Sequence, residues 1–305
     1  MILCAGLSPA WQHTLFFDRF DFGEVNRAKK GVWCASGKVV NTAAALASLD
    51  VEHRMATVVG SDWADAAFRR DLSATGVRFG LSTSVQSSIR ICTTLLVNGQ
   101  PTTELVEECG PLADGEIALF RSHLIEYLNL ASAIVISGSM PKGTDVRLWA
   151  EVLKATSAPA VLDIRGPELL EALAAKPLLV KPNREELAAT VGRPLTSENE
   201  VIEAANEIRC RGTQWVLVTD GAKPAVLAGS DGAIRVHGVS VKTINPIGCG
   251  DTLAATFAWR VVEGDAVVDA VRWGVAAAAA NAESELPARF RRERVEELLG
   301  SVHIE

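Results

Sequence analysis

The sequence has no apolar run of the roughly 18 residues that a membrane-spanning helix needs. It also has no excess of basic residues, because 30 Lys and Arg stand against 37 Asp and Glu, for a net charge of −7. We therefore expect neither a nucleic acid nor an anionic membrane as a partner, since both attract positively charged proteins. The first residues, Met-Ile-Leu-Cys-Ala-Gly-Leu, lack a basic segment and predict a strand, not a signal peptide.

Cysteine and histidine are too few and too scattered for a disulfide framework or a histidine-based metal site. The six cysteines include no Cys-x-x-Cys pair, and none of the five histidines stands at ligand spacing. Scattered cysteines in a long chain are typical of reduced thiols, so we expect a cytoplasmic protein. The P-loop, the Gly-x-Ser-x-Gly elbow and the kinase His-Arg-Asp loop are missing as well. Phosphoryl transfer, if it occurs, must use another design.

What the sequence does contain is a regular alternation of short apolar strands and helices from about residue 113 onward. Its 305 residues, 48% of them apolar, are enough to bury a large core. The alternation predicts an α/β fold in three layers, with a mostly parallel sheet covered by helices on both faces. Ligands of such sheets bind past the carboxyl ends of the strands. Unusual short motifs follow the predicted strands there: Ser137–Lys142, Asp163, Lys181–Asn183, Thr219–Gly221 and Gly248–Asp251.

Residues 77–109 have a different character. The stretch 90–97 alternates and is β-branched, Asn98-Gly99 is a strong hairpin turn, and extended sequence continues to about residue 107. Together with extended pieces within about 10–35, this stretch predicts a small antiparallel sheet inserted into one domain that spans 1–305. That sheet is either an extension of the edge of the main sheet or a lid over a site.

The stretch Gly248-Cys249-Gly250-Asp251 joins a glycine turn to a helix predicted at 251–263. Backbone N–H groups left unpaired at such a turn, at the positive end of the helix dipole, are suited to hold an anion. A carboxylate there would repel a resting phosphate. It becomes useful if it takes a proton from a hydroxyl that attacks a phosphoryl group. The alternative is that Asp251 is only the N-cap of the helix.

Two cationic side chains are candidates to bind a second anion. Lys38 follows Gly37 at the start of a predicted helix, where its charge and the helix dipole add. Arg90 begins the hairpin strand, and its guanidinium can form two parallel hydrogen bonds to the same anion. Asn41 lies one turn further along the Lys38 helix, and it either faces solvent or binds a hydroxylated ligand.

Asn183 and Glu186 stand three residues apart where a strand runs into a helix. On one helix face, an amide and a carboxylate suit a hydrated Mg²⁺ ion, which needs few protein ligands. The same spacing also fits a capping box, which is a purely structural feature.

Four motifs, in chain order, resemble those of the ribokinase-like (PfkB) carbohydrate kinases. Within that family they are most similar to the phosphosugar branch, tagatose-6-phosphate kinase and 1-phosphofructokinase. The resemblance runs from residue 1 to about 285 and is carried by Ser36–Asn41, Ser137–Gly143, Val180–Leu187 and Asn245–Asp251. It implies a three-layer ribokinase-like domain with a β lid that pairs with the lid of a second copy, and so a homodimer.

The resemblance also implies a Mg-ATP-dependent kinase that phosphorylates a ketohexose phosphate, either fructose 1-phosphate or tagatose 6-phosphate. Asp251 would be the general base, and the N–H groups of Gly248, Cys249 and Gly250 would form the anion hole. Mg²⁺ would lie at Asn183 and Glu186. Residues implied for the substrate are Gln12, Gly37, Lys38, Asn41, Arg90 and Ser137. Residues implied for ATP are Lys181, Asn183, Thr219, Gly221 and Asn281.

The departures from the family pattern fall mainly on the sugar side. Ser8 and Gln12 stand where Asn and Asp are usual, and Ser36 and Val39 stand where glycines are usual. These changes leave two alternatives open: a kinase of a non-phosphorylated sugar or nucleoside, or a sugar-phosphate-binding protein with weakened catalysis. The intact Asp251 speaks against the second, because a binding protein has no need of the base.

Overall fold

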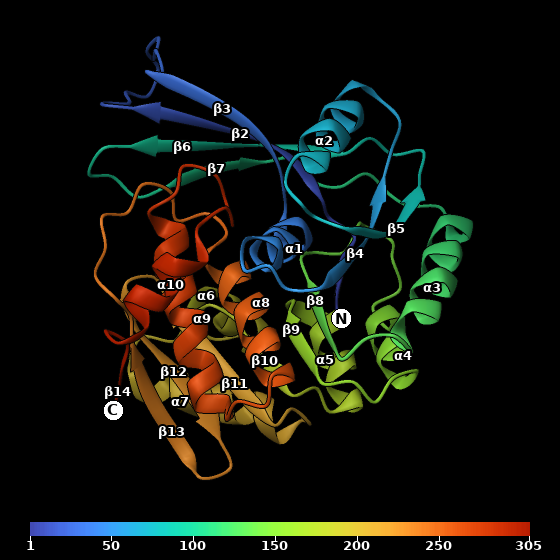
Figure 1. Cartoon of the computed structure of the whole chain (residues 1–305), viewed down its shortest axis with the longest axis vertical. Coiled ribbons are helices and arrows are strands. Elements are labelled where there is room, and N and C mark those ends of the chain that lie inside the picture. The colour runs from blue at the N-terminus through green and yellow to red at the C-terminus, as the bar shows by residue number, and fades with distance from the viewer.

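The computed structural model describes residues 1–305, except for the side chains of residues 81–84. The strands of the described chain form one sheet of ten strands and a second sheet of four. Figure 1 shows the four-stranded sheet at the top, standing clear of the body that contains the larger one. Among the described residues, none of the helices is both long and apolar enough to cross a bilayer.

The ten-stranded sheet is mostly parallel, as the alternation of strands and helices predicts. Its order is β14-β13-β12-β11-β10-β9-β8-β1-β4-β5, parallel from β5 to β11 and antiparallel from β11 to β14. The strands are β1 (Ile2–Ala5), β4 (His53–Val59), β5 (Phe79–Ser84), β8 (Ala133–Ser137), β9 (Ala160–Asp163), β10 (Leu179–Val180), β11 (Trp215–Asp220), β12 (Lys223–Gly229), β13 (Gly232–His237) and β14 (His303–Ile304).

Helices cover both faces of this sheet, which confirms the three-layer fold. One face packs against α1 (Lys38–Ser48), α2 (Trp63–Ser73), α8 (Cys249–Val262), α9 (Val267–Ala282) and α10 (Arg292–Leu299). The other packs against α3 (Asp114–Leu128), α4 (Leu148–Lys154), α5 (Gly166–Ala172) with the short 3₁₀ turn Leu173–Ala175, α6 (Arg184–Val191) and α7 (Glu198–Cys210). Alternate residues of β1 divide between the two cores, Ile2 on one side and Leu3 on the other.

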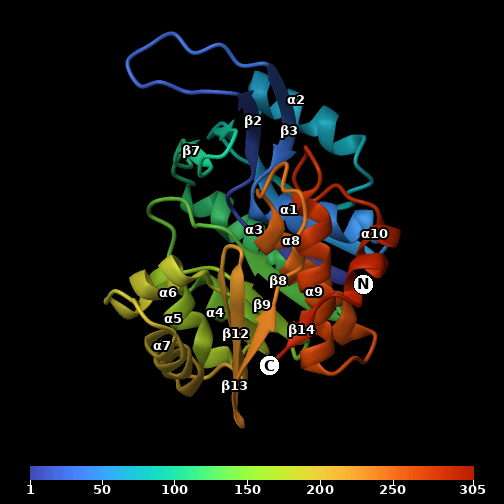
Figure 2. The ribbon, with the colours of Figure 1, turned by 90° about the vertical axis from the view of Figure 1, so that its left-hand side faces the viewer.

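The smaller sheet has the order β3-β2-β6-β7, with strands β2 (Ala10–Phe17), β3 (Lys30–Ser36), β6 (Arg90–Val97) and β7 (Thr103–Val106). The outer pairs β2–β3 and β6–β7 are antiparallel, and the central pair β2–β6 is parallel. The turn predicted at Asn98-Gly99 joins β6 to β7. Figure 2 shows the loop between β2 and β3 reaching well beyond the body.

One strand within 77–109 lies elsewhere than predicted. Strand β5 pairs in parallel with β4 at the edge of the large sheet, so only the later part of 77–109 enters the smaller sheet. The physical reason is the connection, because β4, α2 and β5 form a strand–helix–strand crossover that returns the chain to the same sheet. Helix α2 begins after Asp62, and the Asp62 carboxylate accepts the N–H groups of Ala64 and Asp65.

Candidate active site

Helix α8 begins at a turn whose backbone only glycine adopts easily. Gly248 is the N-cap, with φ of 83°, in the left-handed region. Asp251 is therefore not the cap but lies inside the first turn of the helix, which excludes the structural alternative for this residue. The Cys249 N–H reaches the carbonyl of Pro246 at 3.3 Å, whereas those of Gly248 and Gly250 have no acceptor in the described structure. These two N–H groups are available to an anion.

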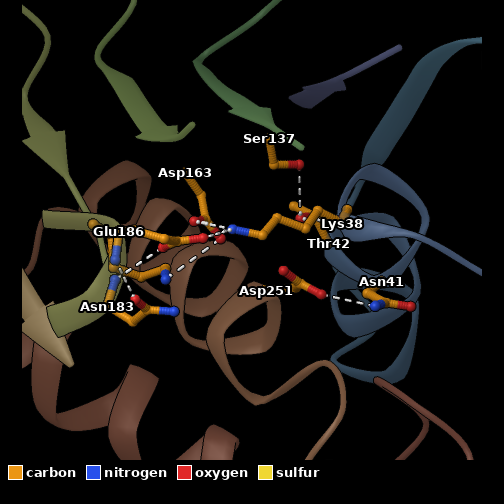
Figure 3. Close-up of polar contacts among 9 residues, drawn as sticks. Lys38, Asn41, Thr42, Ser137, Asp163, Asn183, Glu186 and Asp251 are labelled. Atoms are coloured by element: carbon orange, nitrogen blue, oxygen red, sulfur yellow. Dashed lines mark hydrogen bonds and ion pairs between the residues drawn. The ribbon is translucent and has the colours of Figure 1, made fainter. Parts of the chain in front are cut away.

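The carboxyl group of Asp251 is buried, at 6% exposed, and accepts a hydrogen bond from Asn41 Nδ2 at 2.7 Å (Figure 3). Burial and the nearby Asp163 raise the pKa of Asp251 to about 7, against the opposing influence of Lys38, Asn41 and Lys181. A carboxyl group with a pKa near neutrality exchanges a proton readily at physiological pH. The structure directs the amide of Asn41 to Asp251, and the contact of Asn41 with the sugar stays a prediction.

Lys38, the first residue of α1, lies between two carboxylates. Its Nζ is 2.8 Å from Asp163 Oδ1 and 3.0 Å from Glu186 Oε1 (Figure 3). Burial alone would lower the pKa of Lys38, but Asp163 and Glu186 raise it above its usual value, so the side chain stays charged. The cation expected to meet a phosphate is therefore held by this pair of acids.

Asp163, the last residue of β9, has a larger part in the site than the sequence predicts. It is 2% exposed, and its second oxygen is 3.4 Å from Nζ of Lys181, which directly follows β10. Burial would raise the pKa of Asp163, but Lys181 and Lys38 lower it below the usual value. The one sequence signal was its position, a carboxylate at the carboxyl end of an apolar strand. Gly250 leaves room for Lys181, because a Cβ there would lie 3.1 Å from Nζ.

Asn183 and Glu186 form the capping box that the sequence left as the structural alternative. Asn183 Oδ1 accepts the N–H of Glu186 at 2.7 Å, and Glu186 Oε2 accepts the N–H of Asn183 at 2.9 Å. The other carboxylate oxygen of Glu186 binds Lys38. Glu186 thus takes part in both the helix cap and the charged cluster, while the amide oxygen of Asn183 is used by the cap.

The residues predicted for the sugar side lie at the base of the smaller sheet. Gln12 is 3% exposed, and its Nε2 donates to Thr94 Oγ1 at 2.6 Å. Arg90 Nη2 donates to the carbonyl of Ser8 at 3.2 Å, and Arg90 Nε is buried without a partner in the described structure. Arg90 and Lys38 therefore have separate protein partners.

Gly37 precedes α1, and Ser137 is the last residue of β8. Gly37 has φ of 95°, and a Cβ there would come within 2.7 Å of the carbonyl oxygen of Ser8. Ser137 ends β8 beside Asp163 on β9, and its hydroxyl is 3.4 Å from that of Thr42 on α1. Both residues bring α1 against the carboxyl end of the large sheet.

Of the residues predicted to bind ATP, Thr219 and Gly221 lie at the end of β11, whereas Asn281 lies in the core. Thr219 pairs with Asn183 through an isolated parallel bridge, and the exposed Gly221 follows β11 with φ of 59°. Asn281 is fully buried, and its Nδ2 donates to the carbonyl of Ile247 at 2.9 Å. A side chain buried behind the glycine turn supports that turn from within. A contact between Asn281 and ATP stays a prediction.

Comparison with known proteins agrees with this arrangement. The family model described as "pfkB family carbohydrate kinase" matches residues 3–291. A 1-phosphofructokinase from Haloferax volcanii is 30% identical over 289 residues, covering 90% of this chain and 88% of the relative.

Two solved structures share the fold. A possible 1-phosphofructokinase from Thermotoga maritima superposes with a TM-score of 0.90 at 18% identity, covering 100% of this chain and 98% of that one. Phosphofructokinase-2 from Escherichia coli in complex with fructose-6-phosphate superposes with a TM-score of 0.85 at 24% identity, covering 98% of each chain. The match of the family model over nearly the whole chain decides the assignment: this protein belongs to the pfkB family of carbohydrate kinases and is an ATP-dependent sugar kinase.

Proposed function

We propose that this kinase transfers the γ-phosphoryl group of Mg-ATP to a hydroxyl of a ketohexose phosphate, fructose 1-phosphate or tagatose 6-phosphate, and so forms a bisphosphate. The observation that carries the proposal is the buried Asp251 carboxyl group in the first turn of α8, next to the unpaired N–H groups of Gly248 and Gly250. The name of the Haloferax relative, 1-phosphofructokinase, supports a phosphorylated fructose as acceptor.

In the proposed reaction, the acceptor hydroxyl oxygen attacks the γ-phosphorus while its proton passes to Asp251. The bond from the γ-phosphorus to the bridging oxygen breaks, and ADP leaves with that oxygen. The N–H groups at the start of α8 would hold the phosphoryl oxygens as negative charge develops on them. Lys181, 3% exposed and next to Gly250, adds a fixed positive charge on the same side.

The residues around Lys38 fit a magnesium ion. The carboxylates of Asp163 and Glu186 already hold the ammonium group of Lys38, so this place attracts a cation. No three His, Cys, Asp or Glu side chains of the described residues form a metal site by themselves. That agrees with Mg²⁺, which takes one or two carboxylates and completes its shell with water and substrate phosphates. Bound there, Mg²⁺ would offset negative charge on the phosphates.

Of the predicted pair of ligands, Glu186 is the better candidate for Mg²⁺. The amide oxygen of Asn183 already accepts the N–H of Glu186, so Asn183 acts mainly by fixing the helix start. Asp163 is the natural second carboxylate, because it shares Lys38 with Glu186.

Two cations support an acceptor that already carries a phosphate. Arg90 has a buried Nε with no acceptor among the described residues, and an anionic oxygen would satisfy it. Lys38 is 32% exposed in its side chain and can exchange its carboxylate partners for a phosphate when Mg²⁺ arrives. A free sugar or nucleoside remains the second candidate, because the uncharged Gln12 is tied to Thr94 where relatives have an aspartate.

The smaller sheet would act as a lid and as the contact with a second copy of the chain. Large apolar side chains are exposed on its strands and on the loop between β2 and β3 (Figure 2): Phe22, Val25, Trp33, Leu105 and Val106. Phe22, at 94% exposed, has almost no packing within its own chain. Exposed apolar residues gathered in this way are typical of protein interfaces.

All six cysteines are free thiols, which supports a cytoplasmic location.

A screen for coupled ATP consumption tests the proposal. The purified enzyme with Mg-ATP should turn over fructose 1-phosphate or tagatose 6-phosphate with a higher kcat/KM than it shows for fructose, ribose or nucleosides. A clear preference for the free sugars would remove the phosphosugar assignment in favour of the second candidate. Binding of sugar phosphates without turnover of any acceptor would contradict the proposed mechanism.

A further inference from the structure

Three buried side chains form a line that ends in the proposed base. Ser36 Oγ donates to Asn41 Oδ1 at 3.0 Å, and Asn41 Nδ2 donates to Asp251 Oδ2 at 2.7 Å. Their exposed fractions are 1%, 3% and 6%, so water does not compete for these hydrogen bonds. Figure 3 shows the second link, between α1 and α8.

The chemistry of an amide explains why Ser36 matters to Asp251. An ionised carboxylate only accepts hydrogen bonds, so Asn41 supports it only when its NH₂ group faces Asp251. Rotation of the amide by half a turn would direct a carbonyl oxygen at the carboxylate, which is repulsive. The ionised carboxylate sets the orientation of the amide, and the hydroxyl of Ser36 then donates to the amide oxygen and holds the Asn41 side chain in that orientation.

Local structure places Ser36 in reach of Asn41. Ser36 is the last residue of β3, and Asn41 lies in the first turn of α1. Gly37 between them has φ of 95°, which turns the chain sharply from strand to helix. The Asn41 N–H donates to the Gly37 carbonyl at 2.9 Å and fixes the start of the helix. The backbone thus holds the two side chains on the same side of the turn.

Other groups face Asp251, but they act by charge and not through the orientation of the amide. Lys38 on α1, Asp163 at the end of β9 and Lys181 after β10 all affect its charge state. A change at Ser36 leaves these three groups in place. In the phosphosugar branch that this sequence resembles, a glycine is usual at position 36, so the hydroxyl is a feature of this chain.

We propose that Ser36 is a positioning residue that holds the Asn41 amide with its NH₂ group toward Asp251, and thereby keeps the carboxylate aimed at the acceptor hydroxyl. The inference rests on the proposed role of Asp251 as base. It adds a residue that touches neither substrate but sets the rate of the chemical step.

Steady-state kinetics of Ser36→Ala test this inference. We expect kcat to fall about five- to tenfold, the size of effect for one buried hydrogen bond, with the KM values for ATP and sugar phosphate within about twofold of wild type. Ser36→Thr keeps a hydroxyl and should recover at least about half of kcat. Ser36→Gly is a second variant that lacks the hydroxyl. Glycine is usual at this position in the branch that the sequence resembles, so this variant should fold.

A double-mutant cycle with Asn41→Ala separates action through Asn41 from a general structural effect. Because Ser36 acts only through the amide, Ser36→Ala should change kcat by less than about twofold in the Asn41→Ala background. Equal losses in both backgrounds would overturn the inference. Ser48→Ala is a matched control, since it removes a hydroxyl that donates to the carbonyl of Ala288 at the far end of α1.

The outcomes separate the two proposals. If the wild-type enzyme phosphorylates none of the sugar phosphates, the proposed function fails. If the wild type is active and Ser36→Ala matches it in kcat, only the role of Ser36 is overturned.

Discussion

The ammonium group of Lys38 lies 2.8 Å from the carboxylate of Asp163, and this contact joins the start of α1 to the end of β9 across 125 residues of sequence. Glu186 and Lys181 extend it into a cluster of alternating charges at the carboxyl end of the large sheet. Such a cluster holds charges in a fixed geometry, ready for a ligand that carries both a metal ion and phosphates.

Removing Asp163 should destabilise the protein strongly. Asp163→Ala leaves Lys181, which is 3% exposed, without its buried counter-charge. The loss of one partner of a buried ion pair costs about 3–5 kcal/mol. Urea unfolding followed by circular dichroism measures the change. Asp145→Ala, which removes the exposed pair with Arg147 and a hydrogen bond from the Arg147 N–H, is the control and should lower the unfolding midpoint much less. Equal midpoints for both variants would contradict the structural role of Asp163.

Replacing the proposed base should remove activity without removing the fold. Asp251→Asn keeps the shape and an acceptor for Asn41 but cannot take a proton, so we expect kcat to fall about 10²–10⁴-fold. The KM values should change much less. Coupled ATP consumption measures the rate, and thermal unfolding checks the fold. A variant with near-full activity would show that the proton leaves by another route.

The rate should depend on pH with a midpoint near 7. Asp251 must be ionised to accept a proton, and its pKa is raised to about 7, so kcat/KM should fall as pH drops through 7. The stability linkage has the opposite direction. A raised folded-state pKa means that the contribution of Asp251 to stability is greatest below the unfolded value of about 4 and is lost as pH rises toward 7. A flat rate profile between pH 5.5 and 8 would be inconsistent with this role.

Lys38 should affect the phosphosugar more than the nucleotide. Lys38→Ala removes the cation that would leave Asp163 and Glu186 for the acceptor's phosphate, so the KM for the sugar phosphate should rise more than the KM for ATP. Initial-rate kinetics with each substrate varied in turn measure both values. Lys154→Ala changes an exposed lysine on α4 and is the control. A larger rise in the KM for ATP would assign Lys38 to the nucleotide side.

The exposed loop of the smaller sheet should control assembly. Phe22 is 94% exposed, and Phe22→Asp should convert a dimer into a monomer, because a buried charge without a partner is costly at an interface. Size-exclusion chromatography with light scattering measures the mass. Leu130→Asp alters another exposed apolar residue, after α3, and should leave the mass unchanged. A monomeric wild type would contradict dimerisation through this sheet.

Much of the site follows from sequence for a simple physical reason. The carboxyl ends of parallel strands meet at one edge of a sheet, so motifs that follow successive strands are expected to meet there. Lys181, Glu186 and Asp251 follow this rule, and so does Asp163, although no motif marked its role. Because β5 lies within the stretch 77–109 that was assigned to the smaller sheet, its pairing with β4 was missed.

Side-chain partners were beyond the reach of sequence patterns. Which face of α1 meets α8 depends on packing between distant segments, and that packing directs Asn41 to Asp251 and not outward. In the same way, Asn281 is a polar residue in an alanine-rich helix, and only the fold shows that it is buried beneath Ile247 and Cys249. Patterns of residue type predict where the site lies but not which donor meets which acceptor.

At the base of the smaller sheet, Ser36 and Arg90 flank Ala10 in register on three adjacent strands. Any tilt of this sheet would therefore move the support of the base and the proposed phosphate-binding cation together. A change that shifts this sheet would therefore be expected to alter both the binding of the acceptor and the rate of proton transfer.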